Sequence, residues 1–194
     1  QPLGNAVGNA LEVKEAIATL RGEGPKDRTE LCLTIGSCML QLSGLADNDE
    51  EAKEKLQSVI ENGSALNKLA SFVEAQGGNK NMVYEPELLP KAAIISPLYA
   101  PCDGYIDRIA CDEVGICSLI LGGGRETKES KIDLSVGIVL QKKVGDYVRK
   151  GEPLAVIHAN DEEKKKICEE RLLAAYRISN EKKDEGPVIR GLVR

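Results

Sequence analysis

The spacing of apolar residues changes near residue 90, and this change restricts the fold more than any other feature of the sequence. Residues 9–77 place apolar side chains three and four positions apart, as amphipathic helices do. Farther along the chain, short runs rich in Ile and Val take over, and such runs are typical of strands. A polar stretch, residues 77–91, lies between the two patterns. The sequence therefore predicts an α+β chain made of two regions, 1–90 and 91–194.

The first region is predicted to be mainly helical. Its expected helices run from Asn9 to Arg21, from the Asp27 turn to Leu42, from just after Asp47 to Asn62, and from Ser64 to Gly77. Asp27 and Glu30 have the spacing of a capping box, so we expect them to cap the second helix. That helix carries apolar residues on nearly every face, which predicts that it is central and buried.

The second region is predicted to combine strands with two helices. Strands are expected over 92–100, 104–110, 132–140 and 154–159, and helices over 113–121 and 161–179. The tail Pro187–Val193 is expected to add an edge strand.

Composition excludes several classes of function. Lys and Arg number 26 and Asp and Glu number 31, so the net charge is -5, and aromatic residues make up 3% of the chain. An acidic chain with few stacking side chains is not expected to bind nucleic acid. The one histidine, His158, excludes a His-rich metal site, and its place at a strand end favours a structural role over a catalytic one.

The cysteines and the apolar runs indicate a cytoplasmic protein without a membrane partner. The six cysteines form no Cys-x-x-Cys pair, and several lie in apolar runs, so we expect buried thiols in a reducing compartment. The most apolar long stretch, residues 31–46, is interrupted by polar residues and is not expected to span a membrane. Gln1 stands where a complete chain would have Met and lies inside a motif, so a fragment of a longer chain is expected.

Two glycine-containing segments are candidates for ligand binding. In Gln1–Val13, Gly and Asn residues precede a helix on which Glu12 and Glu15 stand one turn apart. Free carbonyls and a carboxylate suit a hard cation, although a capped helix with two solvated glutamates fits the same pattern. The second segment, Leu121–Arg125, is similar to a phosphate-binding loop but follows a helix instead of opening one. A helix stop followed by a surface Arg explains it equally well.

Turn residues in the second region are similar to those of biotinyl and lipoyl carrier domains. Gly145-Asp146 and Lys150-Gly151 are turn pairs that flank short strand segments. A carrier also needs a modifiable lysine on a hairpin tip. After Leu154 the sequence has no lysine before Lys164, which lies in a predicted helix. A shared architecture without the carrier function is the expectation.

Several motifs taken together closely resemble the pyrimidine-nucleoside and thymidine phosphorylase family. The resemblance is carried, in order, by Gln1–Glu15, Leu121–Arg125, Ile132-Asp133-x-x-Val136-Gly137, Val144-Gly145-Asp146 and Pro153–Ala159. It implies the helical part of an α/β domain over 1–90, followed by a C-terminal α/β-hammerhead (barrel-sandwich-like) domain over 91–194. It also implies a homodimeric enzyme that cleaves uridine, thymidine or deoxyuridine with phosphate to give the base and a pentose 1-phosphate.

The resemblance also implies which site residues this chain carries. A potassium ion is expected on the main-chain carbonyls of Leu3 and Ala6 and the carboxylate of Glu15. The Gly122–Arg125 loop (Gly122, Gly123, Gly124 and Arg125) is expected to take part in closing the active site. The family's phosphate loop, Lys-x-Ser-x-Gly-Gly-x-Gly-Asp, and its base-binding Arg, Ser and Lys have no counterpart here. We therefore expect no catalytic residue and no activity in this chain by itself.

Two alternatives remain open from the sequence. The first is a non-catalytic binding or carrier module built on a barrel-sandwich. The second is a phosphoribosyltransferase of the anthranilate type. Such an enzyme would need a diphosphate-binding glycine loop, and it would not account for the segment Val144–Leu154.

Overall fold

A computed structural model describes residues 1–125 and 127–191 and divides the α+β chain into two compact units. The sheet unit comprises Gln1–Val13 and Leu89–Gly186. The helical unit comprises Lys14–Leu88, with the segment that begins at Pro187. The chain passes between the units within the first helix, at Val13, and again between Leu88 and Leu89. The first residues of the chain are therefore part of the same unit as its C-terminal half.

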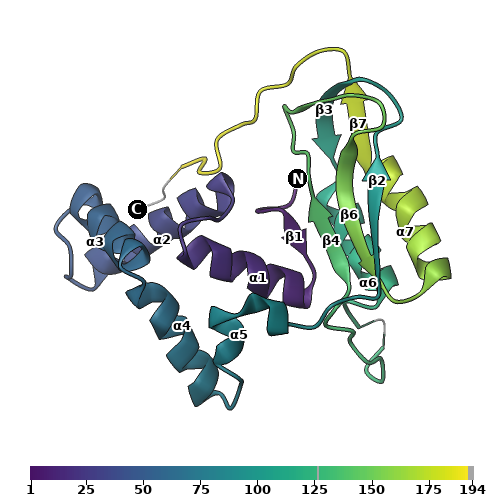
Figure 1. The fold of residues 1–194 in the computed structure, drawn as a ribbon. Coiled ribbons are helices and arrows are strands. Elements are labelled where there is room, and N and C mark those ends of the chain that lie inside the picture. Colours follow the sequence, from purple (N-terminus) through teal and green to yellow (C-terminus); the bar gives the residue numbers. More distant parts are fainter. Residues whose placement is uncertain (126, 192–194) are drawn as a thin grey trace. The chain divides into compact units, whose positions relative to one another are not determined.

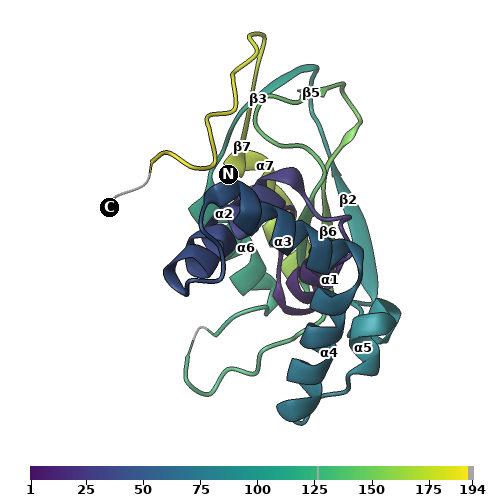
Figure 2. The same cartoon turned by 90° about the vertical axis from the view of Figure 1, so that its left-hand side faces the viewer.

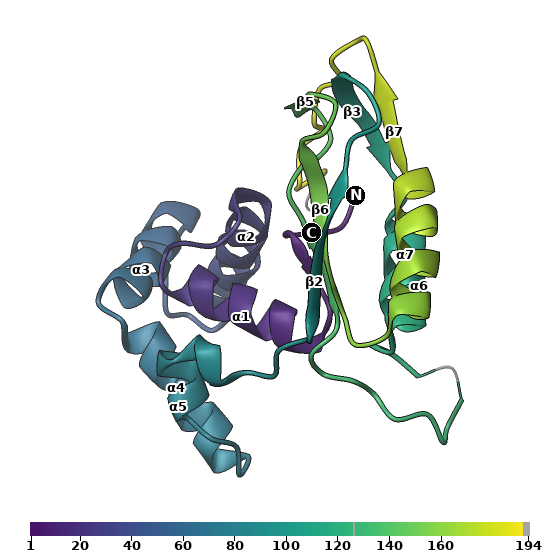
Figure 3. The ribbon, with the colours of Figure 1, turned by 45° about the vertical axis from the view of Figure 1, so that its right-hand side comes forward.

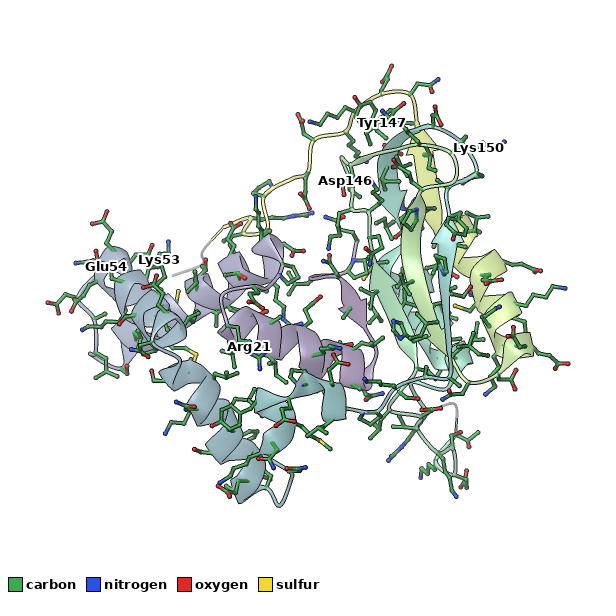
Figure 4. The ribbon with its side chains drawn as sticks, in the orientation of Figure 1. Arg21, Lys53, Glu54, Asp146, Tyr147 and Lys150 are labelled. Atoms are coloured by element: carbon green, nitrogen blue, oxygen red, sulfur yellow. The ribbon has the colours of Figure 1, made fainter. Side chains whose placement is uncertain are left out.

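The helical unit contains the helices that the sequence predicts. They are α1 (Asn9–Leu20, of which Lys14–Leu20 belong here), α2 (Lys26–Leu42), α3 (Asp49–Glu61) and α4 (Ser64–Ala75). Two short elements, α5 (Asn81–Tyr84) and η1 (Pro86–Leu88), occupy part of the predicted loop. Figure 1 shows α2 beside α3. Arg21, labelled in Figure 4, ties the end of α1 to α5, because its guanidinium donates to the carbonyls of Val83 at 3.2 Å and Tyr84 at 2.7 Å.

Two predictions about α2 are wrong. The helix starts at Lys26 after Pro25 without a side-chain cap, and Asp27 accepts a hydrogen bond from the amide of Arg28 instead of forming a capping box. The helix is also not buried, since Met39 and Leu42 are 65% and 89% exposed. The reason is that α2 is covered along one side only, where Gly36 lets it approach Leu56 of α3 closely.

The sheet unit contains two antiparallel sheets. The strands are β1 (Ala6–Val7), β2 (Ile94–Tyr99), β3 (Gly104–Ile109), β4 (Gly137–Leu140), β5 (Tyr147–Val148), β6 (Pro153–Ala159) and β7 (Tyr176–Ser179). One sheet has the order β1-β4-β6-β2, and the other has the order β5-β3-β7. Figure 2 shows the second sheet at one end of the unit. The edge strand β1 comes from the first residues of the chain and pairs with β4, with Ala6 opposite Val139.

The core of this unit lies between the four-stranded sheet and two helices. Helices α6 (Cys111–Leu121) and α7 (Glu162–Ala175) pack side by side on one face of the sheet (Figure 3). Residues that alternate along the strands point into this core, including Ile138 and Leu140 of β4 and Ile157 of β6. Ile95 and Tyr99 of β2 point the other way and are 60% and 54% exposed. This alternation is the period-2 pattern expected of a sheet with one buried face.

The last predicted helix and the predicted edge strand differ from the structure. The helix ends at Ala175, and the next four residues form β7, because Tyr176 and Ile178 pair with Ile109 and Ile106 of β3. The segment 187–191 is not a strand, and the remainder of the predicted tail strand lies outside the described residues.

The prediction that the cysteines are buried holds for two of them. Cys117 of α6 and Cys168 of α7 are fully buried, and the Cys117 thiol donates to the Cys168 carbonyl at 3.9 Å. The hydrogen bond with Cys117, together with burial, raises the pKa of the Cys168 thiol, so Cys168 is uncharged at neutral pH. Cys38 is partly exposed, and Cys32, Cys102 and Cys111 are exposed. Among the described residues, no helix combines the length and the hydropathy needed to cross a membrane.

Candidate functional site

The N-terminal loop is fixed to the β4–β5 connection of the same unit. The ammonium of Lys143 donates to the carbonyls of Pro2 and Gly4 at 2.5 and 2.6 Å. The amide of Val144 donates to the Gln1 side chain at 2.7 Å. The two hydrogen bonds from the Lys143 ammonium are charge-assisted, and such bonds are stronger than neutral ones. The conformation of the predicted cation-binding loop is therefore set by a lysine that lies more than a hundred positions farther along the chain.

The main-chain carbonyls of Pro2, Gly4 and Asn5 accept hydrogen bonds from the β4–β5 connection or from β4, and those of Leu3 and Ala6 are arranged differently. The amide of Leu140 donates to the Asn5 carbonyl at 2.8 Å, so Asn5 is in a hydrogen-bonded pair of the ladder. Ala6 is the next residue along β1, and in an antiparallel ladder its carbonyl is directed away from β4, toward the open edge of the sheet. The Leu3 carbonyl accepts no hydrogen bond from the described residues. These two oxygens are the kind of ligand that a potassium ion takes.

Glu12 and Glu15 have different partners, although they stand one helical turn apart on α1. A carboxylate oxygen of Glu12 accepts from the amide of Gly8 at 3.0 Å, so this side chain turns back to the loop as a cap. Glu15 belongs to the helical unit, where its carboxylate accepts from the guanidinium of Arg28 at 2.7 Å. Its side chain is 8% exposed. Arg28 is the positive partner that a nearly buried carboxylate requires, and a carboxylate oxygen is also a donor type that suits a hard cation.

A pocket of about 300 Å³ lies in the sheet unit between the start of α1 and the end of α6. The lining residues are Val7, Gly8, Asn9, Glu12, Gly115, Ser118, Leu119, Gly123 and Gly124. Two residues of the three-glycine segment, Gly123 and Gly124, are part of this lining. Gly122 ends α6 with a φ of 103°, and the amide of Gly123 donates to the Ser118 carbonyl at 2.9 Å. The side chain of Asn9 holds this segment from the other side by donating to the Gly123 carbonyl at 2.9 Å.

This arrangement makes the glycine segment a helix stop rather than a phosphate cradle. The amides of Gly122 and Gly123 are used to close the last turn of α6, as in other helix ends capped by glycine. The segment also follows the C-terminus of the helix, where the helix dipole is negative and disfavours an anion. The exposed Arg125 follows it. That this segment takes part in closing the active site stays a prediction.

A polar cluster that the sequence analysis did not identify joins three connections of the sheet unit. Asp133 accepts from the amide and the hydroxyl of Ser135 at 2.9 and 2.6 Å and from the Asn160 side chain at 2.7 Å. Asn160 in turn accepts from the amide of Ala93 at 2.7 Å. Partial burial of Asp133 raises its pKa, but the hydrogen bonds from Ser135 and Asn160 outweigh this effect and lower it below 3.8. In the sequence, the short Asp-x-Ser spacing is typical of an Asx turn and indicates the contacts between Asp133 and Ser135.

The lowered pKa of Asp133 predicts how this cluster responds to acid. The folded state favours the ionised carboxylate of Asp133. Its contribution to the free energy of unfolding is therefore present above the ordinary pKa of 3.8 and is lost as the pH falls below that value. Replacing Asp133 by Ala is expected to lower the free energy of unfolding by about 1–3 kcal/mol at neutral pH. Urea unfolding should show this difference shrinking near pH 3. Asp184→Ala, which removes an exposed carboxylate from the tail, should change little at either pH. A pH-independent loss for Asp133→Ala would contradict the argument.

The structure also locates the histidine and the two turn segments that the sequence analysis considers. His158 lies within β6, partly buried, opposite Gly137 of β4 and Ile95 of β2. Gly145 and Gly151 have φ values of 92° and 83°, which confirms the two predicted turns. Asp146, Tyr147 and Lys150, labelled in Figure 4, lie at the end of the unit where β5 pairs with β3. The described residues contain no group of three or more His, Cys, Asp or Glu side chains able to hold a metal ion.

Comparison with known proteins identifies related sequences. Residues 105–179 match the pyrimidine nucleoside phosphorylase C-terminal domain. A pyrimidine-nucleoside phosphorylase of Staphylococcus epidermidis is 49% identical over 193 residues, which cover 97% of this chain and 43% of that protein. Those of Staphylococcus haemolyticus and Bacillus subtilis are 54% and 53% identical over 162 residues, covering 84% of this chain and 37% of each relative. The chain therefore spans about two fifths of the length of these curated relatives.

Proposed function

Because this chain is homologous to the pyrimidine-nucleoside phosphorylases and carries their C-terminal domain over residues 105–179, we propose that the complete protein is a pyrimidine-nucleoside phosphorylase. It would cleave uridine, thymidine or deoxyuridine with inorganic phosphate and release the base and a (deoxy)ribose 1-phosphate. The observation that carries this proposal is the identity of 49% over 193 residues, which extends through both units. A carrier module would not account for a match that includes the helical unit.

The chain's own part in that activity is to support it and not to carry out the chemistry. The sequence contains no Lys-x-Ser-x-Gly-Gly-x-Gly-Asp loop, and we propose that the groups that bind phosphate and base lie outside it. The two antiparallel sheets are compatible with an α/β-hammerhead of barrel-sandwich type for the sheet unit. We also propose that the complete protein is a cytoplasmic homodimer, in line with the resemblance.

Potassium is part of the proposal, with the Leu3 and Ala6 carbonyls and the Glu15 carboxylate as ligands. The resemblance supplies this ligand set, and the Ala6 carbonyl, which is directed away from β4, is compatible with it. When bound, the ion would supply a fixed positive charge at the loop. The residues of the chain do the rest: Lys143 fixes the loop, and β1 pairing fixes the direction of its carbonyls.

The test of the function is an assay of the complete protein. Each of the three nucleosides is incubated with and without inorganic phosphate, and the free base and the sugar phosphate are quantified. Phosphate-dependent release of uracil or thymine with an equal amount of pentose 1-phosphate is expected. Release of base without phosphate would indicate a hydrolase, and release from none of the three nucleosides would leave the proposal without support.

The closure loop gives a separate prediction. Arg125→Ala in the complete protein is expected to lower kcat/KM by roughly tenfold if the loop orders over the substrate, because misplaced groups at a closing site cost rate. The thermal midpoint should stay unchanged, since Arg125 is exposed. Lys128→Ala, which removes the same charge from the same exposed connection, is the matched control. Wild-type kinetics for Arg125→Ala would reduce the segment to a linker.

A further inference from the structure

The pocket between the start of α1 and the end of α6 attracts positive charge. Among the described residues that line it, only Glu12 is charged, and this residue is exposed. The amide of Gly8, which could otherwise hold an anion, donates to the Glu12 carboxylate at 3.0 Å. Helix α6 ends at the pocket without a basic residue in its last turn, and the C-terminal end of a helix is partially negative. The pocket therefore favours a cation over an anion.

The hydroxyl of Ser118 is a second polar group that is available to a ligand. Ser118 is 8% exposed and lines the pocket from α6. Its hydroxyl forms no hydrogen bond with any of the residues that the structure describes. None of the described side chains has a nitrogen or oxygen that is both enclosed and unpaired, so the Ser118 oxygen is reached through the pocket. Buried polar groups are normally paired, and a bound molecule with a hydrogen-bonding group would pair this one.

Two glycines keep this space open. Gly115 lines the pocket from α6, and a Cβ on it would meet no atom within 4 Å. A Cβ on Gly123 would lie 2.8 Å from the Ser118 hydroxyl oxygen, so only glycine leaves that hydroxyl room at this position. The Asn9 side chain fixes the segment by donating to the Gly123 carbonyl at 2.9 Å. The resulting volume of about 300 Å³ is at the lower end of the range for small-molecule sites.

We propose that this pocket binds a small organic ammonium ion that also carries a hydroxyl group, as amino alcohols do. The ammonium lies at the Glu12 carboxylate, where its hydrogen bond is charge-assisted and therefore strong. The ligand hydroxyl lies at Ser118, whose own hydroxyl can donate or accept. Val7 and Leu119, which also line the pocket, contact the carbon atoms of the ligand. All of these residues belong to the sheet unit, so the site is complete within it.

The experiment compares three molecules of nearly the same shape on the complete protein, at neutral pH in an amine-free buffer. Serinol has an ammonium between two hydroxymethyl groups, glycerol has a hydroxyl in place of that ammonium, and isopropylamine has the ammonium but neither hydroxyl. Saturation-transfer NMR titrations give each Kd, and the thermal midpoint is a second readout because a ligand stabilises the state that it binds. The Kd of serinol is expected to be about tenfold lower than that of glycerol and about fivefold lower than that of isopropylamine.

Variants of the lining residues locate the site. Glu12→Gln keeps an oxygen that can accept from Gly8 but removes the charge, so it should raise the Kd of serinol about tenfold and leave that of glycerol unchanged. Ser118→Ala should weaken serinol and leave isopropylamine unchanged. Gly115→Leu fills the pocket and should abolish binding, whereas Gly115→Ala adds only a methyl group at the same place and should retain it. Asp112→Asn, which removes an exposed carboxylate of α6 outside the lining, is the control for charge.

Each outcome supports or overturns the proposed site. Weaker serinol binding in Glu12→Gln and none in Gly115→Leu, with thermal midpoints of the free variants near the wild-type value, supports it. Glycerol binding as tightly as serinol would overturn the assignment to an ammonium ion. Serinol binding that is unchanged in Gly115→Leu would place the ligand elsewhere, and no serinol binding to the wild type would overturn the site. Because none of these measurements uses nucleoside cleavage, a failure of the proposed function would not change them.

Discussion

Purified by itself, the 194-residue chain is expected to release no uracil from uridine and no thymine from thymidine in the presence of phosphate. Phosphorolysis depends on groups that position the phosphate and stabilise the departing base, and these effects account for most of the rate. The chain has one histidine, which lies within strand β6, and it contains no Lys-x-Ser-x-Gly-Gly-x-Gly-Asp sequence, the loop that the resemblance implies for phosphate binding. Separation of free base from nucleoside by chromatography measures the outcome directly.

The comparison must exclude phosphorylase from the expression host. A mock purification from host cells without the gene sets the background, and the complete protein assayed at the same concentration sets the upper limit. Base release that follows the chain through successive columns and requires phosphate would show that the catalytic groups lie within these 194 residues.

Replacing Gly137 by Ala is expected to destabilise the sheet unit by about 3–5 kcal/mol, in the range of severe single substitutions. Gly137 opens β4 with a φ of 152°, a conformation that residues with side chains rarely adopt. A Cβ there would lie 2.4 Å from the Val7 carbonyl oxygen and 3.0 Å from the Cα of Gly8. Both obstacles are backbone, so the chain can relieve the clash only by moving β1 away from β4. Urea unfolding of the purified protein measures the loss.

A second glycine of the same unit provides the contrast. Gly115 lies inside α6, and a Cβ there would meet no atom within 4 Å. Gly115→Ala is therefore expected to stabilise the protein by about 0.5–1 kcal/mol through helix propensity. If the free energy of unfolding of Gly137→Ala lies within about 1 kcal/mol of the wild-type value, the approach of β1 to β4 is not as tight as the geometry indicates.

The sequence predicts the long helices and most strands of this fold because their apolar residues repeat with a clear period. It fails for α2, where a uniformly apolar pattern indicated burial although Met39 and Leu42 are exposed. A periodicity shows which side chains are apolar but not which elements cover them. It also fails at Tyr176, where an apolar helix face continues into residues that pair with β3. Strand pairing with a distant segment outweighs local helix propensity there.

The candidate site was predictable only where its groups lie close together in sequence. Leu3, Ala6 and Glu15 are predicted as ligands through a resemblance, and this assignment stays a prediction. Lys143 and Arg28, which hold the loop and the carboxylate, carry no signal in their local sequence. The Asp133 cluster joins residues from three connections, and its partners Asn160 and Ala93 follow from the β2–β6 pairing alone. Contacts of this kind depend on tertiary structure.

The pairing of β1 with β4 has a consequence for how this architecture can be exchanged between genes. Recombination at the passage between Leu88 and Leu89 would transfer a sheet unit without Gln1–Val13. The recipient would then gain a sheet whose inner strand β4 has become an unpaired edge, with the amide of Leu140 deprived of its acceptor on Asn5. Such an edge favours pairing with other chains. A productive exchange must carry both segments together, so the two parts of this sequence are expected to be inherited as one block.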